Sequence, residues 1–374
     1  MSRSDAFTLG VEEEYQVIDP QSRELSSKAR SIIQVEATPG EGQDPIQPEL
    51  HLCQVEIATG VCQTLADVRR DLTEARGRVI RAAKQNGSAI VAAGTHPFSS
   101  WRDQELSPKD RYYELADTLK QVIRELIIYG CHVHVGIEDR EIAVQVVNRS
   151  RIYLPILLAL SANSPFWMGQ KTGYDSYRME QWWRLPSAGP PPIFADYAEH
   201  NQVIQQFVDF GIVDEPTKIY WDIRLSERFP TVEFRVADVC ATVDEAVMLA
   251  GLCRAIAQVA YDDCRADKDY PQVRPSVLRA AMWQAARYGL DGELIDFEKN
   301  KSLPAKKTVE HLLERVRPAL EKAEDWEEVS RLVKTTLSRG NAATRQKQVY
   351  DKTKSCESVV DFLIGEMGKI EKLE

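Results

Sequence analysis

The amino-acid sequence predicts an α+β protein, in which a mainly antiparallel sheet with interspersed helices is followed by a helical C-terminal third. Strand-like segments with alternating apolar residues are confined to the first 240 positions. The last two, 218–225 and 231–238, are close enough in sequence to pair as a hairpin. After Val243 the apolar residues recur every three or four positions almost to the end. The hairpin spacing favours antiparallel pairing over a doubly wound parallel sheet.

Four earlier segments are expected to be strands, because their apolar residues alternate or run without interruption: 7–18, 50–57, 88–93 and 131–137. Between and after them, the spacing of apolar residues predicts amphipathic helices at 65–85, 110–128 and 141–162. Pro155 should kink the last of these helices. Five helices are expected in the C-terminal third: 243–265, 275–288, 306–323, 325–338 and 343–368.

The segment 163–195 fits neither pattern, because it is rich in glycine, proline, serine and aromatic residues. A loop of this length inside a compact domain is usually a binding loop or lid, and otherwise a linker. We expect residues 1–374 to form a single catalytic domain. Its sheet-bearing part would end at about residue 240, and its helical part would begin at about residue 241.

Composition limits the partners and the compartment. The 374 residues carry a formal net charge of −10, which argues against binding to nucleic acid or to an anionic membrane. No stretch of about 18 apolar residues occurs, so a membrane-spanning helix is not expected. The seven cysteines are scattered without a Cys-x-x-Cys motif, which is typical of reduced thiols in a cytoplasmic protein.

Polar residues recur at alternate positions of several strands and should therefore share one face of the sheet. The pairs are Glu12 with Glu14, His132 with His134, Asp222 with Arg224, and Glu233 with Arg235. A single strand of this kind is usually the solvated side of an antiparallel sheet. Here, however, the residue types are metal ligands and anion-binding groups, which favours a shared cavity.

Two carboxylates at alternate positions repel each other unless a cation lies between them. Oxygen ligands suit Mg²⁺ or Mn²⁺, which also bridge to substrate phosphates. Glu49 and Glu56 offer two more carboxylates. Seven positions separate them, so both can reach one cavity only if a turn or bulge interrupts the strand. The two histidines leave a second interpretation open, a zinc-dependent hydrolase, because imidazoles suit zinc.

The chain has no Gly-x-x-x-x-Gly-Lys-Ser/Thr loop and no Gly-x-Gly-x-x-Gly after a strand. A Gly-x-Ser-x-Gly elbow is also missing. If the protein uses ATP, metals and side-chain cations must therefore hold the phosphates.

The polar strand motifs belong to a longer ordered set. In chain order they are TLGVEEEYQVIDP, ELHLCQVEIATG, CHVHVG, LSANSPFWMGQKTGYDSYR, IYWDIR, PTVEFRVAD and RGNAATRQ. Together they resemble the bacterial carboxylate–amine ligases of the glutamate–cysteine ligase type 2 family, from about residue 7 to about residue 346. GVEEE alone would be a weak signal, whereas the ordered set is specific.

The resemblance implies a fold related to the catalytic domain of glutamine synthetase, a curved antiparallel sheet whose polar concave face holds ATP and Mg²⁺. Metal binding is implied for Glu12, Glu14, Glu49, Glu56, Glu233 and His132. Catalytic roles are implied for Glu233, Arg235 and His132. His134 would lie beside His132, toward the substrate.

The implied activity joins the γ-carboxylate of glutamate to cysteine or another amine, with small molecules as the only partners; a homo-oligomer is compatible with the sequence. ATP would activate the carboxylate as an acyl phosphate, a step that depends on positioning and charge neutralisation. Arg235 would stabilise the transferred phosphoryl group. Arg178 or Arg224 would hold the substrate carboxylate, unless they form ordinary ion pairs. A metal-dependent hydrolase and a non-catalytic nucleotide-binding module remain alternatives.

Overall fold

The computed structural model describes residues 7–35 and 46–369. Within these residues an antiparallel sheet of seven strands runs through the molecule. Six strands follow the order β2-β3-β1-β5-β9-β8, and the seventh, β4, pairs with the C-terminal end of β1. The strands are β1 (Leu9–Ile18), β2 (Gln47–Pro48), β3 (Gln54–Ala58), β4 (Ala89–Val91), β5 (Gly130–Gly136), β8 (Ile223–Leu225) and β9 (Thr231–Asp238).

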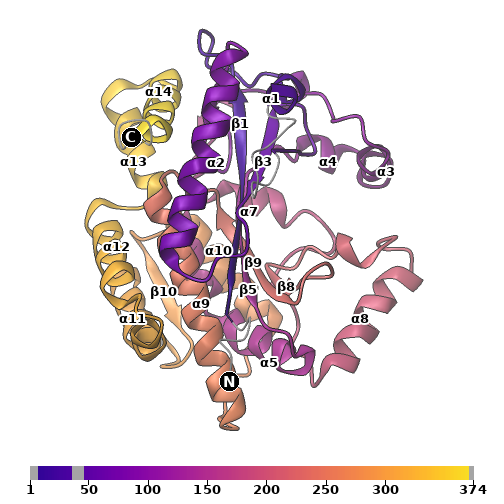
Figure 1. Ribbon diagram of the computed structural model, residues 1–374, viewed down its shortest axis with the longest axis vertical. Coiled ribbons are helices and arrows are strands. Elements are labelled where there is room, and N and C mark those ends of the chain that lie inside the picture. Colours follow the sequence, from indigo (N-terminus) through magenta and orange to yellow (C-terminus); the bar gives the residue numbers. More distant parts are fainter. Residues whose placement is uncertain (1–6, 36–45, 370–374) are drawn as a thin grey trace.

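Two long helices, α2 (Leu65–Gln85) and α9 (Val243–Arg265), lie along one side of the sheet (Figure 1). Thr64 and Thr242 begin them with capping boxes, in which the threonine and an acidic residue three positions later satisfy each other's backbone N–H groups. The apolar side chains of both helices join those of the strands in one core. On the other side of the sheet lie α3 (Asp110–Leu119), α4 (Gln121–Glu125) and α8 (Tyr197–Asp209) (Figure 1).

Two predicted helices are interrupted. Residues 110–128 form α3 and α4, which are separated at Lys120, where φ is 51°. The predicted helix 141–162 becomes α5 (Arg140–Ser150), a 3-10 turn and α6 (Leu154–Ser161). Pro155 lies at the start of α6, where its missing N–H costs no helical hydrogen bond. The kink expected at Pro155 is thus a change of helix just before it.

The C-terminal third is mainly helical, as predicted, and lies on the side of α2 and α9 (Figure 1). Its helices after α9 are α10 (Pro275–Tyr288), α11 (Ala305–Lys322), α12 (Trp326–Arg339), α13 (Ala342–Thr353) and α14 (Cys356–Met367). A hairpin of β10 (Glu293–Asp296) and β11 (Lys301–Pro304) was not predicted. The single predicted helix 343–368 is wrong, because Lys354 adopts a left-handed conformation and Ser355 caps a new helix.

The segment 163–195 contains more regular structure than a simple loop. Its first half forms the hairpin of β6 (Phe166–Trp167) and β7 (Gln170–Lys171), followed by α7 (Tyr177–Trp182). The predicted strand 218–225 is shortened to β8, since residues 216–218 form a 3-10 turn. Among residues 7–35 and 46–369, no helix is long and apolar enough to cross a membrane.

Candidate active site

The polar residues of four strands are aligned across the sheet by the strand register. Glu12 of β1 is opposite His132 of β5, and His134 is opposite Glu233 of β9. On the far side of β9, Arg224 of β8 is opposite Glu233. The predicted polar face is therefore one continuous surface, built from side chains that are far apart in sequence.

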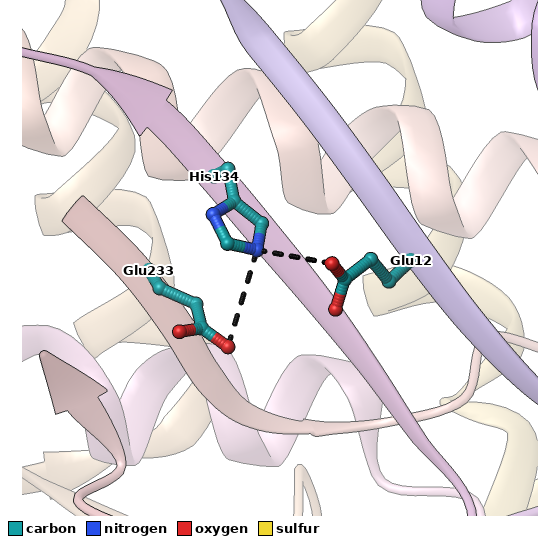
Figure 2. A group of neighbouring side chains, drawn as sticks. All are labelled: Glu12, His134 and Glu233. Carbon is teal, nitrogen blue, oxygen red and sulfur yellow. Dashed lines mark ion pairs between the residues drawn. The ribbon is translucent and has the colours of Figure 1, made fainter. Parts of the chain in front are cut away.

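Glu12, His134 and Glu233 form the histidine cluster (Figure 2). Each offers one ligand atom, and these atoms lie within 4.8 Å of one another. His134 Nε2 is 3.4 Å from Glu12 Oε1 and 3.9 Å from Glu233 Oε1, and all three side chains point toward one another (Figure 2). His134 Nδ1 lies 2.9 Å from Thr231 Oγ1, which fixes the ring and leaves Nε2 toward the carboxylates.

Glu14, Glu49 and Glu56 form the carboxylate cluster, with one oxygen of each within 4.8 Å of the others. Glu14 and Glu56 are paired in the β1–β3 register. Glu49 reaches them because the chain reverses between β2 and β3, and these two strands pair antiparallel. The turn that the seven-residue separation required is therefore present.

The carboxylate cluster is electrostatically strained without a cation. Burial, and next the charge of Glu49, raise the pKa of Glu14 to about 7. Burial and the charges of the neighbouring carboxylates also hold the pKa of Glu56 well above its usual value. Three oxygen ligands and excess negative charge are the conditions that suit Mg²⁺ or Mn²⁺. The residues present therefore fit a hard divalent cation.

The histidine cluster differs from the carboxylate cluster, because the pKa of its Glu12 is lowered and not raised. Burial acts to raise the pKa of Glu12, but the contacts of this carboxylate with the imidazoles of His132 and His134 outweigh it and hold this pKa well below its usual value. His134 Nε2 is buried and has no hydrogen-bond partner among the described residues. An ionised carboxylate beside an unpartnered imidazole nitrogen also fits a divalent cation.

Glu233 is held by two arginines. It pairs with Arg235 Nη1 and accepts a hydrogen bond from Arg224 Nε at 2.7 Å. Arg224 Nη1 donates to the carbonyl oxygens of Thr217 at 3.0 Å and Ile219 at 2.5 Å. Both guanidinium groups are therefore fixed at the edge of the histidine cluster, where they bring positive charge to an acidic surface.

Arg178, one of the two arginines predicted to hold the substrate carboxylate, lies in α7 and is only 1% exposed. The Trp182 ring lies 5.7 Å from the Arg178 guanidinium carbon and 5.4 Å from that of Arg235. The aromatic ring thus holds the two arginines near each other.

The structure also separates the two histidines. His134, predicted to contact substrate, joins the group of possible metal ligands, whereas His132 Nδ1 lies 3.2 Å from Glu12 Oε2 at its edge. Burial, and next the charge of Arg235, lower the pKa of His132 to about 4, so the ring is neutral at physiological pH. His132 therefore accepts or donates hydrogen bonds without carrying a charge.

Glu13 faces away from this surface. Its carboxylate is 0% exposed and accepts hydrogen bonds from Arg76 Nε at 2.9 Å and Nη2 at 2.5 Å, and from the Tyr15 hydroxyl. The buried charge thus has the partner that its position on the apolar side demands.

Comparison with known proteins identifies the family. A family model described as glutamate-cysteine ligase family 2 matches residues 8–362. The chain belongs to glutamate–cysteine ligase family 2. A protein of Rhodopirellula baltica named as a candidate glutamate–cysteine ligase 2 is 42% identical over 344 residues, covering 91% of this chain and 92% of that protein. A protein of the same name from Solibacter usitatus is 38% identical over 361 residues, covering 96% and 93%.

Solved structures share the fold of this family member. Glutamate–cysteine ligase of Francisella tularensis, solved in complex with AMP, matches with a TM-score of 0.69 and 12% identity, covering 98% of this chain and 89% of that chain. A bifunctional glutathione synthetase of Pasteurella multocida matches with a TM-score of 0.68 and 13% identity, covering 98% of this chain and 52% of that chain. The predicted curved antiparallel sheet with flanking helices is thereby confirmed.

Membership in glutamate–cysteine ligase family 2 makes the protein an ATP-dependent carbon–nitrogen ligase that joins a carboxylate to an amine. ATP and a divalent metal belong to this activity, and its substrates are small molecules. The hydrolase interpretation of the two histidines receives no support from the family or from the relatives.

Proposed function

We propose that this ligase joins the γ-carboxylate of glutamate to cysteine or a related amine, with ATP and Mg²⁺, which Mn²⁺ could replace. The observation that carries the proposal is the pair of clusters on one polar sheet face, one of three carboxylates and one of two carboxylates and an imidazole. The names of the sequence relatives support glutamate and cysteine as substrates.

The acidic, basic and neutral residues of the site would have different roles. The carboxylate cluster and the histidine cluster would hold divalent cations, which when bound neutralise phosphate charge. Glu233 orients Arg235 toward the same surface, where the guanidinium would stabilise the transferred phosphoryl group. His132, neutral and beside Glu12, would orient that carboxylate without adding charge.

A substrate carboxylate needs a cation that is not already saturated by the protein. Arg224 Nε donates a hydrogen bond to Glu233, and Arg224 Nη1 donates to two carbonyl oxygens. Arg178 Nε, in contrast, is buried and has no hydrogen-bond partner among the described residues. We therefore favour Arg178 for the substrate carboxylate, with Arg224 as a support for Glu233.

An amine screen tests the proposal. The purified protein is incubated with Mg²⁺, ATP, glutamate and one of several amines, and ADP release is measured. We expect release to require both glutamate and the amine, with cysteine among the best acceptors. Release that is indifferent to glutamate, or metal-dependent hydrolysis of ATP alone, would overturn the assignment of substrates.

A further inference from the structure

Asp238 is a buried carboxylate at the end of β9. It is the last residue of the motif PTVEFRVAD, in which the sequence predicted roles only for Glu233 and Arg235. Its side chain is 0% exposed. Oδ2 accepts hydrogen bonds from the backbone N–H of Asn163 at 2.8 Å and from Ser164 Oγ at 2.7 Å. Its other oxygen, Oδ1, accepts one from Ser176 Oγ at 2.8 Å. One carboxylate therefore joins both ends of the segment that leads into α7.

The same segment places Arg178 over β5. The Arg178 amide nitrogen donates to Ser164 Oγ at 3.0 Å. A Cβ built on Gly130 would lie only 2.3 Å from Arg178 Nη2, so the guanidinium occupies the space that this glycine leaves free. Gly130 is opposite Asp238 in the sheet, and its N–H donates to Glu14 Oε2 at 2.6 Å. Arg178 thus lies above Gly130, close to both carboxylates.

The guanidinium has only long contacts with oxygen. Arg178 Nη1 is 4.0 Å from Asp238 Oδ1, and Nη2 is 3.5 Å from the Arg235 carbonyl oxygen. A buried arginine that lacks a close ion pair is costly, so its position must be enforced by the surrounding backbone. The hydrogen bonds of Asp238 to residues 163, 164 and 176 provide that constraint.

We propose that Asp238 is a positioning residue of this ligase: it fixes Arg178 beside Glu14, where the guanidinium binds an oxyanion of a substrate. The inference rests on the proposed function for the identity of the substrates. An amino-acid carboxylate and a phosphate of ATP share this chemistry, and the kinetic constants for the two substrates distinguish them. Asp238 itself contacts no substrate, since its oxygens accept hydrogen bonds from the segment.

The test compares Asp238→Asn, Arg178→Lys and the double variant in steady-state ADP release. Binding that is equal in the ground state and the transition state appears in KM alone. We therefore expect Asp238→Asn to raise KM for glutamate by roughly tenfold to a hundredfold, with a smaller change in kcat. A rise in KM for ATP instead would assign the phosphate as the oxyanion. The double variant should be no worse than Arg178→Lys, because both changes remove one interaction.

Asp325→Asn serves as the matched control, because Asp325 is another buried carboxylate, paired with Arg254 in the C-terminal helices. It should lower the melting temperature and leave both KM values unchanged. Unchanged KM values in Asp238→Asn, or effects that add in the double variant, would overturn the proposal.

A measurement that needs no turnover tests the positioning role of Asp238 independently of which substrates the ligase uses. Amide hydrogen exchange in residues 163–178 should become faster in Asp238→Asn and stay unchanged in Asp325→Asn. If the wild-type protein releases no ADP with glutamate, the substrate assignment fails, while the exchange rates still decide whether Asp238 fixes the segment. Unchanged exchange in Asp238→Asn would contradict the positioning role.

Discussion

Three consecutive glutamates on β1 show how strand alternation assigns different roles to the same residue type. Glu12 and Glu14 reach the polar face, where each joins one cluster of possible metal ligands. Glu13 points to the opposite side and pairs with Arg76, which is itself 0% exposed. The side of the sheet, and not the residue type, therefore decides which carboxylate serves chemistry and which serves stability.

Replacement of these glutamates by glutamine should separate the two roles. Glu12→Gln and Glu14→Gln remove a charge from the polar face and should each lower kcat by on the order of a hundredfold or more. Glu13→Gln leaves Arg76 as an uncompensated buried charge and should cost about 3–5 kcal/mol of unfolding free energy. ADP release and denaturant unfolding measure the two effects. Full activity in Glu12→Gln and Glu14→Gln would remove both from the site.

The two polar-face variants should also differ in stability when metal is absent. Glu14 has neighbours of like charge, so its replacement relieves repulsion and should raise the melting temperature at about pH 8. Glu12 is stabilised by His132 and His134, so its replacement should not raise the melting temperature. Thermal unfolding in EDTA compares the two. Equal shifts would show that the clusters are not electrostatically distinct.

The pKa of Glu14 predicts a link between metal binding and protons. In the metal-free folded protein this pKa is about 7, compared with 4.5 for the unperturbed group. The folded state therefore holds the proton more tightly, and this group lowers the unfolding free energy as pH rises from about 4.5 to about 7. A cation must displace the proton, so Mg²⁺ affinity should rise over the same range.

Calorimetry of Mg²⁺ binding at about pH 6, in two buffers with different ionisation enthalpies, measures the protons released. We expect proton release that becomes smaller in Glu14→Gln. Identical heats in the two buffers would show that the carboxylate cluster is not protonated before metal binds.

At the scale of elements, the strands could be predicted better than the positions at which a helix breaks or the strand register shifts. Alternation predicted β1, β5 and β9, and the odd spacing of Glu49 and Glu56 required the turn that the structure contains. The break in the helix at Lys120 could not be foreseen, because a positive φ in a lysine leaves no mark in the sequence. The grouping of His134 rather than His132 depends on a register shift between β5 and β9, which alternation alone does not locate.

Gly130 on β5 offers a test of the packing beneath the clusters. In Gly130→Ala the new methyl group would lie 2.3 Å from Arg178 Nη2 and 3.2 Å from His132 Nε2. Overpacking of this kind costs about 1–3 kcal/mol, and displacement of Arg178 should also lower ligase activity. Gly10→Ala on β1 is the control, because its Cβ would make an ordinary 3.6 Å contact with His134. Equal behaviour of the two variants would contradict the close approach of Arg178.

At the scale of the whole molecule, the helical C-terminal third supports the segment beside the site. Asn341 begins α13 and is 0% exposed. Its Nδ2 donates to the Ala159 carbonyl oxygen at 3.0 Å and to Asp175 Oδ2 at 3.2 Å, while Oδ1 accepts from the Thr344 amide. The motif RGNAATRQ could be recognised in the sequence, but its contacts could not, because they join residues more than 160 positions apart.

Asn341→Ala should therefore cost more than the loss of a helix cap. We expect a decrease of about 2–4 kcal/mol in unfolding free energy, since buried partners of the amide are left unsatisfied. Ser355→Ala, which removes the partly buried cap of α14, should cost only about 1 kcal/mol. Denaturant unfolding measures both. Equal losses would show that α13 does not support residues 159–175.

The central claim is that the polar sheet face activates a carboxylate by phosphoryl transfer, and oxygen tracing tests it most directly. Glutamate labelled with ¹⁸O in its γ-carboxylate is incubated with ATP, Mg²⁺ and the acceptor amine, and the released inorganic phosphate is analysed by mass spectrometry. An acyl phosphate leaves one labelled oxygen on phosphate for each amide bond formed. We expect this transfer in the wild-type protein; amide product accompanied only by unlabelled phosphate would contradict the account.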